Sequence, residues 1–223
     1  MSRTPISRSV LLFDLDGTVL DTKDLIIASY HYACDQVLGY RLPDEPLLEM
    51  VGVPLPEQMY KLAPEEHAEA MVKAYRQHNA EAHDRYINYF PKTRETLETF
   101  AEAGWRMAIV TSKRNESARQ GLDSFALAGY FEMIIGFDDT DKHKPDPTPL
   151  LLAAERFAVQ TADCVYIGDS PYDMQAATAA EIYAVGATWG FFTPERLLEA
   201  GAKLLVDKIA DLPAALSFIQ LKR

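Results

Sequence analysis

The sequence has few cysteines and no long hydrophobic run, and these two shortages exclude several classes of protein. Its 223 residues contain two cysteines, Cys34 and Cys164, in segments predicted to be a helix and a buried strand. Cysteines placed in this way favour reduced core side chains over a disulfide, which is typical of the cytoplasm. No apolar run approaches the roughly 18 to 20 residues of a membrane span, and no signal-like apolar segment follows residues 1–9. We therefore expect a cytoplasmic protein with no membrane partner.

Basic residues are scarce relative to acidic ones. The chain has 22 Lys and Arg against 33 Asp and Glu, which gives a net charge of −11. Nucleic acids and anionic membranes reward clustered Lys and Arg, so this balance argues against both as partners. If the substrate is an anion, the site must supply its own positive charge. Hydrophobic residues make up 48% and charged residues 25% of the chain, the usual balance of a globular protein with a substantial core.

The most informative stretch is residues 10–21, VLLFDLDGTVLD. Its four apolar residues predict a buried strand, and two carboxylates, a glycine and a hydroxyl follow at once. In open parallel α/β sheets the ligand crevice lies beyond the carboxyl ends of the strands, so we expect Asp14 and Asp16 to project there. Carboxylates one residue apart repel each other, and a divalent cation relieves this repulsion. Gly17 lets the backbone turn sharply beside a ligand. Taken alone, the stretch is equally compatible with an ordinary Asp-Gly turn.

The rest of the chain divides into a helical part and an alternating part. Helical periodicity predicts a first helix over residues 23–38 and a long one from residue 64 to about 89, with no convincing strand in this region. From residue 91 helices and strands alternate, which is typical of parallel βαβ units. We count about six strands, including residues 10–13. The sequence therefore predicts a core formed by residues 1–20 and 91–223, interrupted once by a helical cap at residues 21–90.

Polar residues follow three further segments of the predicted core. Thr111 follows one strand, and Lys144 lies in a proline-rich loop. Asp169 follows the next buried strand, and Asp173 comes four residues later, which places both carboxylates on one side of a first helical turn. Each has a simple structural explanation as a helix cap, a surface lysine or a turn residue. Their order at successive strand ends favours one shared phosphate and metal site.

These residues resemble the four motifs of the haloacid dehalogenase-like phosphohydrolases: residues 14–18 (DLDGT), Thr111, Lys144-Pro145 and Gly168-Asp169-x-x-x-Asp173. The resemblance implies an α/β fold, with a Rossmann-like parallel sheet core, helices on both faces and an inserted all-helical cap. The cap looks like that of the branch containing phosphoglycolate phosphatases, β-phosphoglucomutase and haloacid dehalogenases. Residues 22–27, 75–79, 83–84 and 144–150 are similar to the bacterial pyrophosphatase that accompanies the HPr kinase/phosphorylase.

The resemblance also implies a role for each residue. Asp14 would be the nucleophile that forms an aspartyl-phosphate, and Asp16 would protonate the leaving group and later activate water. Mg²⁺ would be held by Asp14, Asp169 and the backbone carbonyl of Asp16, with Asp173 orienting this shell. Thr18 would position Asp16. The substrate phosphate would be bound by Gly17, Thr111, Ser112 and Lys144, with Arg76 contributing from the cap.

The presence of Asp16 and Asp169 favours phosphate chemistry over cleavage of carbon–halogen bonds. Two alternatives to a phosphatase remain: a phosphomutase of the β-phosphoglucomutase type, and a catalytically silent binding protein. We expect the substrate to be a small phosphorylated metabolite or pyrophosphate. Arg76, Asn79 and His83 recur along one helix face, where they either bind the distal end of the substrate or pack within the cap. Linkers near residues 20–23 and 90–93 would act as hinges.

Overall fold

The computed structural model describes residues 10–217, and its main sheet has the six strands that the sequence predicts. All neighbouring strands are parallel, in the order β5-β4-β1-β6-β7-β8. Because β1 lies between β4 and β6, the carboxyl ends of these three strands open onto one site. The strands are β1 (Val10–Phe13), β4 (Arg106–Val110), β5 (Met133–Ile135), β6 (Cys164–Gly168), β7 (Tyr183–Ala187) and β8 (Leu204–Val206).

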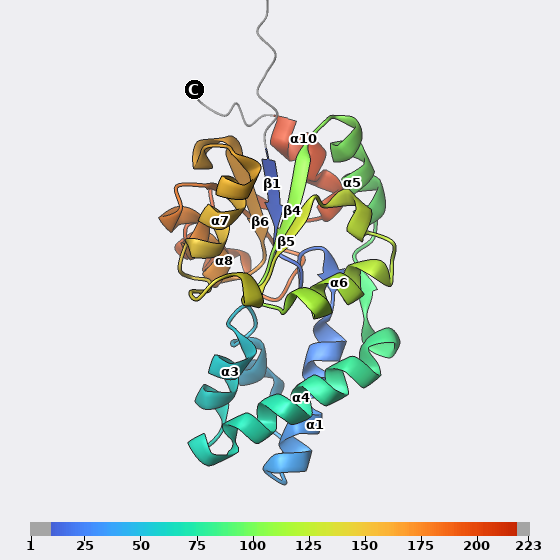
Figure 1. Ribbon diagram of the computed structural model, residues 1–223, viewed down its shortest axis with the longest axis vertical. Coiled ribbons are helices and arrows are strands. Elements are labelled where there is room, and N and C mark those ends of the chain that lie inside the picture. Colours follow the sequence, from blue (N-terminus) through green and yellow to red (C-terminus); the bar gives the residue numbers. More distant parts are fainter. Residues whose placement is uncertain (1–9, 218–223) are drawn as a thin grey trace, which may run out of the picture.

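Helices cover both faces of this sheet (Figure 1). Leu11 and Phe13 of β1 point into one hydrophobic core, while Val10 and Leu12 point into the other, because successive side chains of a strand point to opposite faces of the sheet. The first core is closed by α5 (Thr93–Glu102), α6 (Asn115–Asp123) and α10 (Leu212–Ser217), and the second by α7 (Thr148–Phe157), α8 (Pro171–Ala179) and α9 (Pro194–Glu199). Short 3₁₀ turns are η1 (Ala128–Tyr130), η2 (Phe137–Asp139), η3 (Thr161–Asp163) and η4 (Ile209–Asp211). The predicted α/β fold is confirmed.

Four more helices lie beyond the carboxyl ends of the strands, at the lower end of Figure 1. They are α1 (Lys23–Val37), α2 (Asp44–Leu48), α3 (Leu55–Leu62) and α4 (Glu65–Tyr86). Their apolar faces form a third hydrophobic core, in which Tyr30, Met59 and Met71 are fully buried. We call residues 21–90 the cap. The predicted core span also includes residues 1–9 and 218–223, which lie outside the described residues.

The expectation that the helical region contains no strand is wrong at its C-terminal end, at residues 88–89. β2 (Leu20–Asp21) pairs antiparallel with β3 (Asn88–Tyr89), so the chain enters and leaves the cap through one short ribbon. The long helix also ends at Tyr86, before the predicted position near residue 89, because Ile87 already has extended backbone angles. Two-residue strands carry no periodic signal, and this pair depends on contact between segments far apart in the sequence.

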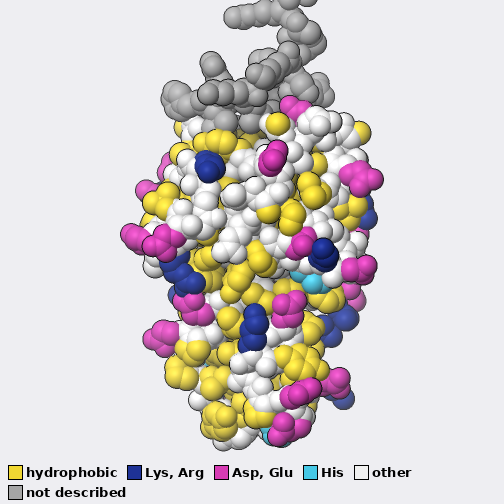
Figure 2. All heavy atoms as spheres, turned by 90° about the vertical axis from the view of Figure 1, so that its left-hand side faces the viewer, with side chains coloured by type: hydrophobic (Ala, Val, Ile, Leu, Met, Phe, Trp, Pro, Cys, Tyr) yellow, Lys and Arg dark blue, Asp and Glu magenta, His cyan; other side chains and the backbone are white. Residues whose placement is uncertain are grey.

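Two expectations from composition can be compared with the structure. Cys34 lies in α1 and Cys164 in β6, and both are buried and free, as predicted. Lysine and arginine side chains are interspersed with aspartate and glutamate over the face in Figure 2. Within residues 10–217, none of the helices combines the length and apolar character that a membrane span requires.

Candidate active site

Three predicted site residues follow the three central strands. Asp14 comes directly after β1, Thr111 after β4 and Asp169 after β6. The backbone continues the ladder into this region, since the Asp14 amide donates to the Ile167 carbonyl at 2.8 Å. All three side chains are buried, with exposed fractions of 5% or less. The sheet order therefore brings together residues that the sequence places far apart.

Lys144 reaches this point from the loop before α7. Its Nζ donates to Asp14 Oδ1 at 2.9 Å, to Asp173 Oδ1 at 2.6 Å and to the Tyr166 hydroxyl at 2.9 Å. Burial opposes the charge of Lys144, but Asp14 and Asp173 outweigh it and hold the pKa of the ammonium above its ordinary value. The ammonium is therefore charged and directed at Asp14.

Asp14, Asp169 and Asp173 form a buried acidic cluster, in which one oxygen of each carboxylate lies within 4.8 Å of the others. Burial raises the pKa of Asp14 to about 7, although the Lys144 ammonium lowers it. Burial and the neighbouring carboxylates Asp173 and Asp14 raise the pKa of Asp169 well above its ordinary value. Three carboxylates and one ammonium leave two uncompensated negative charges when all are ionised. This donor set fits a divalent cation that prefers oxygen ligands.

Asp173 differs from the other two carboxylates because its oxygens are already occupied. Oδ1 accepts from Lys144 and the Tyr166 hydroxyl, and Oδ2 accepts from the amide and hydroxyl of Ser170, which caps α8. Four donors use the acceptor capacity of a carboxylate. Asp173 is thus placed to orient Lys144 and the start of α8, and it is poorly placed as a direct metal ligand.

The side chains of Asp16 and Thr18 contact different parts of the site. The Asp16 side chain lies outside the acidic cluster and pairs with Lys113 Nζ at 2.8 Å. The Thr18 hydroxyl donates to Asp169 Oδ1 at 3.2 Å, which corrects the expectation that it positions Asp16. The cause is local: the amides of residues 18–20 all donate to the Leu15 carbonyl, and this tight turn carries Thr18 toward β6. Gly17 has φ of +77°, and a Cβ there would lie 2.3 Å from Asp169 Oδ2, so only glycine fits.

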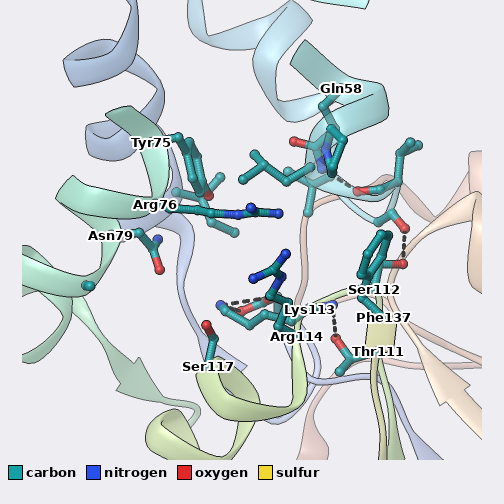
Figure 3. Close-up of a pocket in the computed structure, with 18 of the residues that line it drawn as sticks. Gln58, Tyr75, Arg76, Asn79, Thr111, Ser112, Lys113, Arg114, Ser117 and Phe137 are labelled. Carbon is teal, nitrogen blue, oxygen red and sulfur yellow. Dashed lines mark hydrogen bonds and ion pairs between the residues drawn. The ribbon is translucent and has the colours of Figure 1, made fainter. Parts of the chain in front are cut away.

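A cavity of about 280 Å³ lies between the strand ends and the cap, where Asp14, Asp16 and Thr111 line one wall. It is at the small end of ligand pockets, which typically hold about 300 to 1,000 Å³. The uncharged cap residues Gly52, Val53 and Leu55 line it as well. The three cap residues suggested by the sequence, Arg76, Asn79 and His83, all line it from α4. Figure 3 shows Arg76 reaching into this cavity.

Ser112 also lines the cavity, but its hydroxyl donates to the Gly52 carbonyl of the cap at 2.7 Å (Figure 3). The residue expected to bind phosphate therefore joins the core to the cap in this structure.

Sequence reasoning missed three polar side chains of the site: Lys113, Arg114 and Tyr166. Lys113 and Arg114 line the cavity, and the Tyr166 hydroxyl lies within 3.0 Å of Lys144, Asp173 and the Val110 carbonyl. Lys113 follows Thr111 and Ser112 at the same strand end, which was an available signal. The signal for Tyr166 is a phenol within an otherwise apolar strand, because a buried hydroxyl needs a partner.

Known proteins are similar to this chain over most of its length. The model of the haloacid dehalogenase-like hydrolase family matches residues 11–187. A protein of Caldanaerobacter subterraneus subsp. tengcongensis that carries the name PpaX is 39% identical over 189 residues, covering 85% of this chain and 86% of its own. Pyrophosphatase PpaX of Bacillus velezensis is 31% identical over 204 residues, covering 92% and 94%.

The fold also has solved counterparts. A Haemophilus somnus structure described as a predicted phosphoglycolate phosphatase superposes with a TM-score of 0.86. It is 21% identical, and the match covers 95% of this chain and 99% of that one. The family model matches most of the chain, including the strands that carry Asp14, Thr111 and Asp169. This chain belongs to the haloacid dehalogenase-like hydrolases.

Proposed function

We propose that this protein is a Mg²⁺-dependent phosphohydrolase acting on a small phosphate substrate, with pyrophosphate as the first candidate and phosphoglycolate as the second. One observation carries the proposal: the Asp14 carboxylate lies at the cavity wall, 2.9 Å from a buried lysine. Cationic side chains of Lys113, Arg114 and Arg76 line the same small cavity and supply the positive charge that the chain as a whole lacks. The names of the PpaX relatives favour pyrophosphate.

In this proposal Asp14 attacks the phosphorus atom and the bond from phosphorus to the leaving oxygen breaks, which gives an aspartyl-phosphate. Asp16 donates a proton to the leaving oxygen. Water then attacks the phosphorus and transfers a proton to Asp16, and the Asp14–phosphorus bond breaks to release inorganic phosphate. Asp16 must carry a proton at the first step, and a neutral carboxyl no longer forms an ion pair with Lys113. The Lys113 ammonium would then face the oxygens of the substrate.

The phosphate oxygens would be held by Thr111 and Ser112, at the junction between β4 and α6, together with Lys144 and the backbone at Gly17. Mg²⁺ would be held by Asp14, Asp169 and the backbone carbonyl of Asp16. When bound, it would neutralise charge on the phosphate and align it for attack. Asp173 would act indirectly, by holding Lys144 beside Asp14.

Residues 1–20 and 91–223 would form the catalytic core, and residues 21–90 a cap that covers the substrate. The ribbon of β2 and β3 would serve as the hinge, because it is the two-stranded connection between these parts. Free buried Cys34 and Cys164 agree with a reducing compartment such as the cytoplasm.

The test is a hydrolysis screen of the purified protein in Mg²⁺ with pyrophosphate, phosphoglycolate, a small sugar phosphate and 4-nitrophenyl phosphate. We expect phosphate release from at least one, with pyrophosphate the best substrate, and none from Asp14→Asn. A wild-type protein inactive on all four, or an Asp14→Asn variant that turns over normally, would contradict the proposal.

A further inference from the structure

Two arginines face each other across the cavity. Arg76 reaches in from α4 of the cap, and Arg114 points toward it from the residue before α6 of the core (Figure 3). Both are polar donors with a permanent positive charge, so their approach is unfavourable unless an anion lies between them. Partial burial and the Arg114 charge lower the pKa of the Arg76 guanidinium, as this arrangement requires.

Neither arginine is neutralised in the way that others in the protein are. Arg106 and Arg41 form short, two-pronged ion pairs with Glu132 and Asp35. Within residues 10–217, Arg76 makes no ion pair or side-chain hydrogen bond, and Arg114 has one loose pair with Asp138 at 3.8 Å. Guanidinium groups with unused donors that line one cavity are suited to bind an anionic oxygen group.

A second observation points to a ligand at the same wall. His83 is 3% exposed and lines the cavity, and its Nδ1 contacts Asp84 at 2.9 Å. Its Nε2 is buried and has no hydrogen-bond partner within the described part of the chain. Buried polar atoms normally have a hydrogen-bond partner. His83 Nε2 is therefore a polar atom of the α4 wall that a bound ligand could pair.

The other side of the cap is already joined to the core. Besides the bond from Ser112 to Gly52, the Tyr172 hydroxyl donates to the Glu49 carbonyl at 3.3 Å, and Arg196 pairs with the Glu49 carboxylate. The two facing arginines are thus the part of the interface where like charges oppose closure.

We propose that Arg76 and Arg114 form a subsite for a distal anionic group of the substrate, and that this group holds the cap against the core by lying between the two guanidiniums. The subsite rests on the proposed function, since the reacting phosphate is taken to lie at Asp14. A phosphoryl group suits it better than a carboxylate, because three oxygens and up to two charges can serve both guanidiniums at once. The substrate class is therefore a compound with two phosphoryl groups joined by a short bridge.

The kinetic test compares Arg76→Gln and Arg114→Gln with the control variants Arg85→Gln and Arg119→Gln. Arg85 lies on α4, as Arg76 does, and Arg119 lies on α6, which begins just after Arg114; both are exposed and neither lines the cavity. For each variant, kcat/KM is measured for pyrophosphate and for 4-nitrophenyl phosphate, whose leaving side is apolar. We expect the ratio of the two constants to fall about 10- to 100-fold for each cavity arginine, the usual cost of a hydrogen bond to a charged group, and to stay constant in the controls. Equal losses on both substrates would overturn the proposal.

The binding test does not depend on turnover. Calorimetry in Mg²⁺ compares methylenediphosphonate with phosphonoacetate, which differ only in carrying a phosphonate or a carboxylate at the distal end. We expect the wild type to bind methylenediphosphonate more tightly, and Arg76→Gln or Arg114→Gln to remove most of this preference. A wild type that binds both equally, or variants that keep the preference, would overturn the subsite.

The two hypotheses can fail separately. A protein that hydrolyses none of the four substrates of the screen contradicts the proposed function, while the binding preference still decides the subsite. A protein that hydrolyses both substrates but shows no change of ratio in the arginine variants keeps the function and loses the subsite.

Discussion

Replacing Asp14 by asparagine should abolish the activity seen in Mg²⁺ and should also make the metal-free protein more stable. Asp14 is 4% exposed and shares its surroundings with the carboxylates of Asp169 and Asp173. Burial raises its pKa from 3.8 to about 7, so the folded state holds a proton that the unfolded chain releases. Each pKa unit corresponds to about 1.4 kcal/mol, so ionised Asp14 costs about 4 kcal/mol above pH 7. Asparagine has nearly the same shape and carries no charge.

The sign of the pH dependence follows from the direction of this shift. A folded-state pKa above the unfolded value means that stability is lost as pH rises from about 4 to about 7. The gain in the free energy of unfolding from Asp14→Asn should therefore be small near pH 4, increase as the pH rises and level off above pH 7. Some of the gain is offset because Lys144 loses one of its two carboxylate partners, so about 4 kcal/mol is an upper value.

The assay is urea unfolding in excess chelator at pH 4.5, 6 and 8, with Asp123→Asn on the exposed surface of α6 as the control. Adding Mg²⁺ at pH 8 should then stabilise the wild type more than the variant, because binding to the folded state adds to its free energy of unfolding. If Asp14→Asn is no more stable than the wild type at pH 8, or if their difference does not change with pH, the electrostatic description of the site is wrong.

Three further predictions follow from the site. Asp16→Asn should slow hydrolysis of substrates with poor leaving groups by about 10²- to 10⁴-fold and of 4-nitrophenyl phosphate much less, since nitrophenolate hardly needs a proton; equal losses would remove Asp16 from the acid role. Chelation should abolish activity, Mg²⁺ should restore it and Ca²⁺ should support it poorly, whereas full activity in chelator would refute the metal site. Tyr166→Phe should lower the stability measured by thermal unfolding by about 1 to 3 kcal/mol, because it leaves a buried donor on Lys144 or a buried acceptor on Asp173 without its partner. An unchanged unfolding transition would contradict this.

The strand-end residues of the site were predictable because their signals are local. A buried apolar strand followed at once by a carboxylate or a hydroxyl places Asp14, Thr111 and Asp169 at the same edge of a parallel sheet. Lys144 lies in a loop without periodicity, so its place at the same site was predictable only from its order along the chain among the other polar residues, a pattern that the family resemblance reinforces. The structure brings its Nζ to 2.9 Å from the Asp14 carboxylate across 130 positions of sequence.

The contacts that the sequence did not predict depend on side-chain reach across the fold. The pair between Lys113 and Asp16 joins residues 97 positions apart, and the bond from Thr18 to Asp169 spans 151. No pattern within one segment reports such a distance. The pairing of β2 with β3 was missed for the same reason, since two-residue strands are defined by their partner and not by their own sequence.

The most direct test of the central claim is to look for the phosphoryl group on Asp14. In a single-turnover reaction with ³²P-labelled pyrophosphate and Mg²⁺, the wild-type protein is quenched with acid at early times and digested. We expect label on the peptide that contains Asp14, rising and decaying before or together with the release of phosphate, and no labelled peptide from Asp14→Asn. Release of phosphate without any labelled protein, at rates that Asp14→Asn also reaches, would contradict covalent catalysis by this aspartate.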